Sequence, residues 1–319
     1  WFRNLRYRLF SRLHGAEYSR IDVMNESKLA PPVVVVLVLN DPGEWSDQVL
    51  EGLNNQDYEN FQVLVMNRGP SSNADRVRAA IRDATVKHVP NAKSYAEAAN
   101  AVSGLVEGAA FYLFLRDDTA LAPNAVSLLV EEALESNAGV LGPKVLDFND
   151  PSRILSMGFV VDAFAVATPI VEAGELDQKQ HDRVREVFSV SGHAVLVRSD
   201  LFATIGGFDQ RIADFEEHLD LCWRVQIAGG RVLVVPTATV SSLERISALS
   251  QPLRRRHSMR HRQHIVAKCY GWVHLVPILI LAMVLSLLEV VYSLLALRFR
   301  HARDVFWAWG WNLLQIPYL

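Results

Sequence analysis

The sequence is poor in cysteine and lacks the usual nucleotide-binding loops. Its 319 residues include only two cysteines, Cys222 and Cys269. These are too few for a disulfide framework and lack metal-ligand spacing, so a reducing compartment is expected. No G-x-G-x-x-G sequence follows the first predicted strand and no Walker A lysine loop occurs, which excludes the common dinucleotide and triphosphate cradles. Half of the residues are hydrophobic, which argues against intrinsic disorder.

Positive charge is scarce in the middle of the chain and concentrated at its ends. Residues 1–20 carry five arginines and one glutamate, and residues 250–319 carry nine Arg or Lys and two acids. Because the whole chain has a net charge of −3, residues 21–249 must carry −14. An acidic body disfavours nucleic-acid binding, and the basic ends suit an anionic lipid surface.

Long apolar runs occur only near the C-terminus. Residues 272–297 contain one formal charge, Glu289, and as a helix they would span about 39 Å at 1.5 Å per residue. This length predicts a transmembrane helix, with a buried core helix as the alternative. A second apolar segment at 305–319 is predicted to be cut off by the end of the sequence, and it is either another span or an interfacial segment. The chain opens on Trp1 and closes inside this run, so we expect it to be part of a longer protein.

Basic segments flank the body on both sides. Residues 251–271 are predicted to form a basic amphipathic interfacial segment, and the positive-inside rule then places the preceding domain in the cytoplasm, with the chain at the cell membrane. Residues 1–30 are predicted to be a basic amphipathic segment at the membrane surface or the tail of a preceding membrane hairpin. We interpret His257, His261 and His264 as part of a solvated or headgroup-facing helix rather than as a metal site.

The body alternates predicted strands and helices. Val33 to Leu39 is a continuous β-branched run typical of a strand buried on both faces. Further strands are predicted at 61–66, 85–89, 110–115, 187–197 and 232–235, and helices at 45–55, 72–84 and 94–107. This alternation predicts an α/β fold with a mostly parallel central sheet, whose ligands bind at the carboxyl ends of the strands.

Carboxylates stand where such a sheet would bind its ligand. Asp117 and Asp118 follow the 110–115 strand directly and could hold a divalent cation that grips a diphosphate. On the helix predicted after residue 214, Asp220 and Arg224 are four residues apart and should pair. Glu217 would then lie near the N-terminus of that helix. It is either a general base or part of an exposed acidic first turn.

Taken together, these residues resemble family 2 glycosyltransferases of the GT-A fold, including the rhamnosyl and galactofuranosyl type that builds cell-surface glycans. The resemblance covers roughly residues 33–270, with the GT-A domain itself at 31–250. It is carried by ordered pieces, which are VVVVLVLN at 33–40, NQDY at 55–58, NRG at 67–69, NAKSYAEAAN at 91–100, LRDDTALAPNAV at 115–126, GPKVLD at 142–147, VSGHAVLVRSDLFATIGGFD at 190–209, EEHLDLCWRVQIAGGRVLVVPTATV at 216–240 and HRQHIVAKCYG at 261–271.

The resemblance implies a nucleotide-diphosphate sugar donor, a divalent metal (Mg or Mn), inverting transfer, and a lipid-linked or cell-surface glycan acceptor. Site roles are implied for the following residues. The nucleotide sugar would contact Asn40, Asn67, Asn100, Arg116 and Asp117, the metal would bind Asp118 with Asp117, the base would be Glu217 or His218, and the acceptor side would hold Gly192, His193 and Trp223.

Three positions depart from the family pattern. Arg116 replaces the first acid of the D-x-D motif, His218 stands at the usual basic Asp, and Ser242 stands where a His often completes the metal site. A guanidinium can bind phosphate oxygens, so Arg116 could substitute for metal charge. The alternative hypothesis is a catalytically degenerate GT-A domain that acts as a scaffold or partner-binding subunit of a membrane complex.

Overall fold

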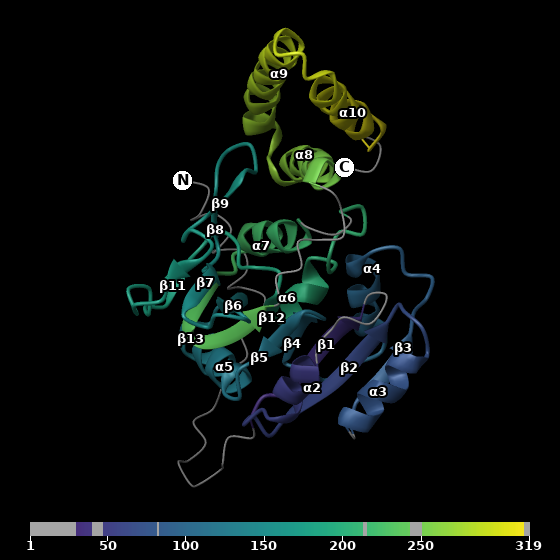
Figure 1. The fold of residues 1–319 in the computed structure, drawn as a ribbon, viewed down its shortest axis with the longest axis vertical. Helices are drawn as coiled ribbons and strands as arrows, with labels where there is room; N and C mark the ends of the chain where they lie inside the picture. The colour runs from purple at the N-terminus through teal and green to yellow at the C-terminus, as the bar shows by residue number, and fades with distance from the viewer. Residues whose placement is uncertain (1–29, 40–46, 82, 213–215, 243–250, 316–319) are drawn as a thin grey trace, which may run out of the picture. The chain divides into compact units, whose positions relative to one another are not determined.

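The computed structural model describes residues 30–39, 47–81, 83–212, 216–242 and 251–315 (Figure 1). Most of the expected segment 1–30 and residues 316–319 of the second apolar segment lie outside the described residues, and so does Asn40. The strands are β1 (Val33–Leu39), β2 (Phe61–Asn67), β3 (Thr85–His88), β4 (Phe111–Arg116), β5 (Thr119–Leu121), β6 (Val140–Asp147), β7 (Arg153–Ser156), β8 (Phe159–Val161), β9 (Ala167–Pro169), β10 (Glu175–Leu176), β11 (Arg185–Glu186), β12 (Ala194–Arg198) and β13 (Val232–Ser242). The helices are α2 (Asp47–Asn54), α3 (Ser72–Ala80), α4 (Tyr95–Asn100), α5 (Ala125–Ser136), α6 (Ser199–Thr204), α7 (Glu217–Ile227), α8 (Gln251–Cys269), α9 (Trp272–Leu295) and α10 (Phe299–Gln315).

A mixed α/β domain is built on one central sheet with the strand order β10-β7-β6-β12-β4-β1-β2-β3. The strands β4, β1, β2 and β3 run parallel to one another. β12 lies antiparallel between β4 and β6, and β13 runs parallel to β6. The predicted fold class, with a mostly parallel central sheet, is confirmed.

The valine-rich strand β1 is buried along its whole length, as its sequence predicts. Val33, Val35, Leu37 and Leu39 pack into the core under α2, α3 and α5. The intervening residues 34, 36 and 38 pack into a second core under α4, α6 and α7. Successive side chains of a strand point to opposite faces, so a run without polar residues is stable only when helices cover both.

Several predicted boundaries are wrong for local reasons. The strand expected at 187–197 is regular only from Ala194, and Ser189 forms an isolated bridge to Phe159. The helix expected at 94–107 ends at Asn100 and continues as a 3-10 turn over Ala101–Gly104. The strand expected at 232–235 runs on to Ser242, because a register shift between Val235 and Thr239 accommodates Pro236, the position where a proline in a strand is tolerated.

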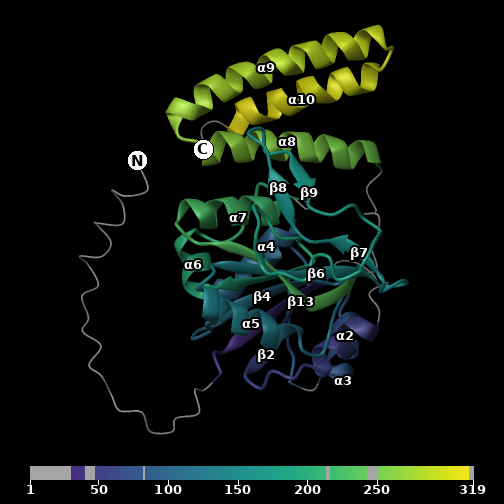
Figure 2. The same cartoon turned by 90° about the vertical axis from the view of Figure 1, so that its left-hand side faces the viewer.

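Helix α8 joins the sheet domain to the C-terminal helices. Figure 2 shows α8 between α7 and the α9–α10 pair. Leu219 and Trp223 of α7 share a small apolar core with Ile265 and Val266 of α8 and Leu275 of α9. The expected interfacial segment is therefore a helix with one side packed on the sheet domain.

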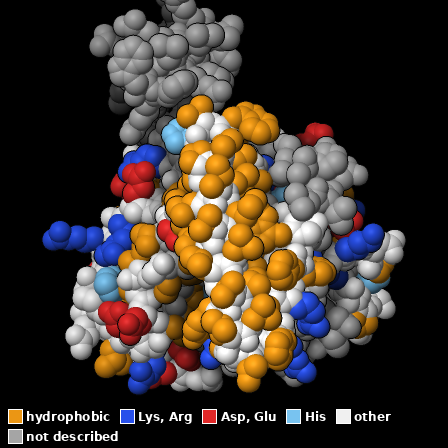
Figure 3. All heavy atoms as spheres, turned by 90° about the horizontal axis from the view of Figure 1, so that it is seen from above, with side chains coloured by type: hydrophobic (Ala, Val, Ile, Leu, Met, Phe, Trp, Pro, Cys, Tyr) orange, Lys and Arg blue, Asp and Glu red, His pale blue; other side chains and the backbone are white. Residues whose placement is uncertain are grey.

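The predicted transmembrane segment is helix α9, the one described helix that is long and apolar enough to cross a membrane. Only 11% of its most apolar 18-residue stretch is buried inside the molecule, which argues against the core-helix alternative. Its exposed large side chains form an elongated hydrophobic surface (Figure 3) and include Val276, Ile280, Leu281, Val284, Leu287, Leu288 and Val291. Glu289 Oε1 of this helix lies 2.6 Å from His301 Nε2 of α10, so its carboxylate has a partner within the protein.

Candidate active site

The candidate site lies where β4 ends beside the loop that precedes β12. Arg116 closes β4 opposite Val38 of β1, and its backbone N–H donates to the His193 carbonyl oxygen at 3.0 Å. Asp117 and Asp118 form the turn that leads into β5. The predicted acidic strand end and the predicted acceptor-side loop are thereby held against each other.

Asp118 is held firmly in this turn. Asp118 is 6% exposed. Its Oδ1 accepts a hydrogen bond from Thr119 Oγ1 at 3.1 Å and lies 3.7 Å from Arg116 Nε. Thr119 is opposite Ser242 in the β5–β13 register. Ser242 is buried there, so the position expected to complete a metal site is close to the acid pair but carries a hydroxyl.

Arg116 is the positive charge of the site. Burial opposes its charge, but the carboxylates of Asp118, Glu217 and Asp117 outweigh this effect and raise the pKa of the guanidinium. The side chain keeps 31% of its surface exposed. Because the charges of Glu217, Asp117 and Asp118 all raise the pKa of Arg116, the structure brings these predicted site residues together.

Helix α7 carries the predicted base at its first residue. Glu217 is 2% exposed and Asp220 is fully buried, so the interpretation as an exposed acidic first turn is wrong. The predicted pair is confirmed, with Arg224 Nε donating to Asp220 Oδ2 at 2.8 Å and Arg224 Nη1 donating to the Ile205 carbonyl at 2.8 Å. These bonds fix α7 against the 205–209 turn.

Gly192 makes room for His218. A Cβ at Gly192 would lie 2.9 Å from His218 Nδ1, too close for an unshifted side chain. Burial lowers the pKa of His218, the Glu217 carboxylate opposes this shift, and Arg116 adds to it. The imidazole is therefore neutral near pH 7, and within the described residues its buried Nδ1 has no hydrogen-bond partner.

His193 lies beside the same charges. Burial, reinforced by Arg116 and opposed by Asp118, lowers the pKa of His193 to about 4. Ser191 Oγ lies 2.6 Å from His193 Nδ1, which orients the ring. Two neutral imidazoles thus face one arginine and a group of carboxylates.

Tyr95 is a site residue that sequence reasoning missed. It begins α4, whose N-terminus is capped by Ser94 Oγ accepting from the Glu97 N–H at 3.2 Å. Burial raises the pKa of the Tyr95 phenol, and the Glu217 carboxylate raises it further, so the phenol stays protonated and can donate. The only sequence signal was its place in the 91–100 piece, at the start of a helix above the carboxyl ends of the strands.

Two predicted nucleotide contacts have structural partners. Asn67 Oδ1 accepts from the Gly69 N–H at 3.0 Å and Nδ2 donates to the Pro70 carbonyl at 2.9 Å. The Asn100 amide makes two 2.8 Å bonds to the Phe208 backbone. Both asparagines shape the turns at the strand ends, and their contact with a nucleotide stays a prediction.

Trp223 packs inside the molecule. Its ring meets Phe188 edge-on with centroids 5.0 Å apart and Tyr270 with centroids 5.2 Å apart. Trp223 is 9% exposed and belongs to the small apolar core between α7 and α8, and its role on the acceptor side stays a prediction.

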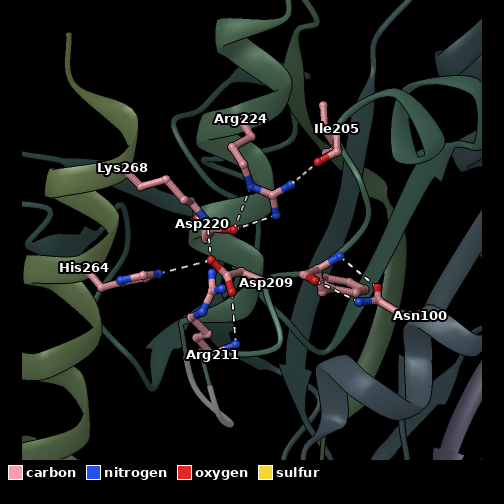
Figure 4. Close-up of polar contacts among 9 residues, drawn as sticks. Asn100, Ile205, Asp209, Arg211, Asp220, Arg224, His264 and Lys268 are labelled. Atoms are coloured by element: carbon pink, nitrogen blue, oxygen red, sulfur yellow. Dashed lines mark hydrogen bonds and ion pairs between the residues drawn. The ribbon is translucent and has the colours of Figure 1, made fainter. Parts of the chain in front are cut away.

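A buried ion-pair network connects α8 to this region (Figure 4). Asp209 Oδ2 lies 2.6 Å from Lys268 Nζ and 3.1 Å from His264 Nε2. Although burial opposes it, these two contacts lower the pKa of Asp209. His261 and His264 are both fully buried, so their interpretation as solvated residues is wrong, and the side chain of His257 lies outside the described residues.

The side chains at the strand end do not by themselves form a metal site. In the described ranges, no three His, Cys, Asp or Glu side chains form a group that could hold a metal ion. Asp118 is instead bonded to Thr119 and lies close to a guanidinium, whose positive charge opposes the binding of a cation there.

The fold and the site together define an α/β domain with charged groups at the carboxyl ends of its parallel strands and a buried carboxylate at the start of α7. Residues 30–259 match the model of the family described as "Glycosyltransferase like family 2". The chain belongs to this family and is a transferase of the glycosyltransferase class.

Known proteins similar to this chain include a named rhamnosyltransferase and several solved structures. A 229-residue alignment is 27% identical to "N-acetylglucosaminyl-diphospho-decaprenol L-rhamnosyltransferase" from two strains of Mycobacterium tuberculosis, covering 65% of this chain and 74% of the relative. Among solved structures, GalNAc-T7 with UDP, GalNAc and Mn²⁺ aligns with a TM-score of 0.57 at 12% identity, covering 72% of this chain. S. aureus TarS aligns with a TM-score of 0.54 at 15% identity, covering 78% of this chain.

The solved structures support the fold alone at these identities. This chain spans about half the length of those chains, 48% of GalNAc-T7 and 42% of TarS.

Proposed function

We propose that the protein is a membrane-attached, inverting glycosyltransferase that moves a sugar from a nucleotide-diphosphate donor to a lipid-diphosphate-linked acceptor at the cytoplasmic face. The observation that carries the proposal is the buried Glu217 at the start of α7, whose charge acts on Arg116, Tyr95 and His218. A carboxylate opposite a phosphate-binding strand end is what a direct displacement requires.

In the proposed transfer step, a group of this site takes up the proton and the nucleoside diphosphate leaves with the electron pair. Glu217, or neutral His218 beside it, accepts the proton of the acceptor hydroxyl. The hydroxyl oxygen then attacks the anomeric carbon from the side opposite the diphosphate. The bond between that carbon and the diphosphate oxygen breaks, and its electron pair leaves with the nucleoside diphosphate. Attack from the opposite side inverts the anomeric configuration.

Two observations support a lipid-linked acceptor. The relative at 27% identity is named for a lipid-diphosphate substrate. In this chain, α7 with its base candidate packs on α8, which leads directly into the apolar helix α9. A site next to a membrane helix suits an acceptor whose tail stays in the bilayer.

A transfer assay on the full chain in detergent tests the chemical step. The assay measures nucleoside diphosphate release from a nucleotide sugar in the presence of a diphosphate-linked lipid sugar. Glu217→Gln should lower kcat by about 10²- to 10⁴-fold if Glu217 is the base, with nucleotide binding retained. Glu186→Gln, an exposed glutamate of β11 paired with Arg231, is the matched control.

His218→Asn separates the two candidates. If His218→Asn loses turnover while Glu217→Gln keeps normal turnover, His218 is the base. Normal turnover of both variants contradicts the proposed site. A chain that binds no nucleotide and transfers no sugar supports the scaffold alternative, which the replacements Arg116, His218 and Ser242 favour.

The cytoplasmic orientation is tested by labelling. Leu134 of α5 is 59% exposed, so Leu134→Cys should react with a membrane-impermeant maleimide only after cells are opened. The wild-type chain, whose Cys222 is buried, gives the background. Labelling in intact cells would contradict the proposed orientation.

A further inference from the structure

Arg116 is held at the strand end with its donors unused. The backbone on both sides is fixed by the β1–β4 register and by the bond to the His193 carbonyl. The guanidinium makes no hydrogen bond to any described residue, and its ion-pair contact is the 3.7 Å approach to Asp118, longer than a hydrogen bond. With 31% of the side chain exposed, its N–H groups are open to a ligand.

The carboxylates next to Arg116 are poorly placed to hold a divalent cation. Asp118 Oδ1 already accepts the Thr119 hydroxyl, and Ser242, the neighbour across the β5–β13 register, adds no charge. A divalent cation on Asp117 and Asp118 would also meet the positive guanidinium, and like charges a few ångströms apart repel strongly in a partly buried site.

We propose that the Arg116 guanidinium binds the diphosphate of the nucleotide donor directly, so that nucleoside diphosphate binding at this site needs no divalent cation. The inference rests on the proposed function and concerns how the same site recognises the diphosphate. A planar guanidinium offers parallel N–H donors that match two phosphate oxygens. The same contact would stabilise the negative charge that the leaving diphosphate gains during transfer.

Nucleotide binding by the full chain tests this directly. UDP, GDP and dTDP are titrated in detergent after EDTA treatment, and again with added Mn²⁺, by calorimetry and by thermal shift. A bound nucleotide raises the unfolding temperature by mass action. At least one of the three should bind in EDTA, with an affinity that Mn²⁺ changes by less than about threefold, a difference below 1 kcal/mol.

Substitutions of Arg116 separate charge, geometry and metal dependence. Arg116→Ala should weaken binding in EDTA by about 10- to 100-fold, the usual effect of losing hydrogen bonds to a charged group. Arg116→Lys should retain part of the affinity, because it keeps the charge but loses the planar fork. Arg116→Asp places a third acid beside Asp117 and Asp118 and should make binding depend on Mn²⁺.

A matched control keeps these results interpretable. Arg153 of β7 is an arginine paired with Asp150 and lies three strands from β4 in the sheet. Arg153→Ala should bind nucleotide as the wild type does. The ligand-free unfolding temperature of each variant shows whether it is folded.

The outcomes distinguish this inference from the proposed function. Wild-type binding that appears only with Mn²⁺ overturns the inference, assigns the metal role to Asp117 and Asp118, and leaves the transferase function standing. Equal binding by wild type and folded Arg116→Ala in EDTA also overturns it. Failure of the wild-type chain to bind any of the three nucleotides in either condition contradicts the proposed function and the inference together.

Discussion

Lys268 of α8 lies 2.5 Å from Asp220 Oδ1 of α7, and the same ammonium lies 2.6 Å from Asp209 Oδ2 (Figure 4). Asp220 is one helical turn after Glu217, the candidate base. The segment that leads into the apolar helix α9 is therefore ion-paired to the helix that begins with the candidate base. Two buried carboxylates share one ammonium, so this contact is expected to matter more than a surface ion pair.

Lys268→Met should lower the free energy of unfolding by about 2 to 3 kcal/mol, because two buried carboxylates lose a partner while Arg224 and His264 remain. Denaturant unfolding in detergent measures this value. Arg198→Ala, which removes an ion pair between more exposed side chains, should cost less than about 1 kcal/mol. Equal effects of the two substitutions would contradict the importance of the α7–α8 network.

This network also shows where sequence reasoning stopped. The Asp220–Arg224 pair was predictable because helical spacing brings residues four apart together. His264 and Asp209 are 55 positions apart, and nothing local indicates that they meet. The arginines around His264 pointed to a solvated helix, but the packing of α8 on α7 buries the histidine instead. The bonds of Asn100 to the Phe208 backbone, 108 positions away, could not be predicted for the same reason.

The pH dependence of stability should report on His193. The unfolded chain protonates this imidazole near pH 6.5, whereas in the folded chain its pKa is lowered to about 4. Between these values the unfolded state binds more protons, so stability falls as the pH is lowered through this window. The contribution of this one group should reach about 3 kcal/mol near pH 4, because each unit of pKa shift corresponds to about 1.4 kcal/mol.

The measurement is a comparison with His193→Asn. Carboxylates with lowered pKa values, such as Asp209, also lose their stabilising effect in acid, so the slope of the wild type alone is not diagnostic. Unfolding free energies from pH 7 to pH 4 should fall less steeply in the variant. Parallel curves would mean that His193 titrates normally in the folded chain.

Gly192→Ala should harm transfer more than stability. The new methyl group would lie 2.9 Å from His218 Nδ1 and 3.3 Å from its Cγ, so the ring must move. A displacement of this size at a reacting group lowers kcat by about 10- to 100-fold. The transfer assay and the ligand-free unfolding temperature are measured together.

Gly104→Ala is the matched control, because a Cβ there has nothing within 4 Å and the residue ends a 3-10 turn. It should keep wild-type activity. Full activity of Gly192→Ala would show that the position of His218 is unimportant for the reaction.

The strand ends were predictable to the extent that they depend on local sequence. The β-branched run of β1 and the acids after β4 predicted charged groups at the carboxyl ends of the strands, and the structure has Arg116, Asp117 and Asp118 there. The burial of Glu217 was not predictable, because the first turn of α7 reads as an ordinary acidic helix start. Only the packing of α7 against the sheet and α8 makes Glu217 a buried carboxylate facing Arg116.

The exposed face of α9 should decide whether the chain stays in the membrane. Leu281 and Leu288 lie two turns apart on this face and are 49% and 60% exposed. Replacing both with arginine should cost about 3 kcal/mol each on insertion into a bilayer. The double variant should therefore be depleted from the carbonate-washed membrane fraction, while the wild type is retained.

Arginine at Leu134 of α5 and Ile227 of α7, which are 59% and 50% exposed in the sheet domain, is the matched control, because it adds the same charge and should leave retention unchanged. Equal retention of both double variants would contradict a bilayer-spanning α9, because two arginines in a spanning helix would carry a cost that the sheet-domain arginines do not.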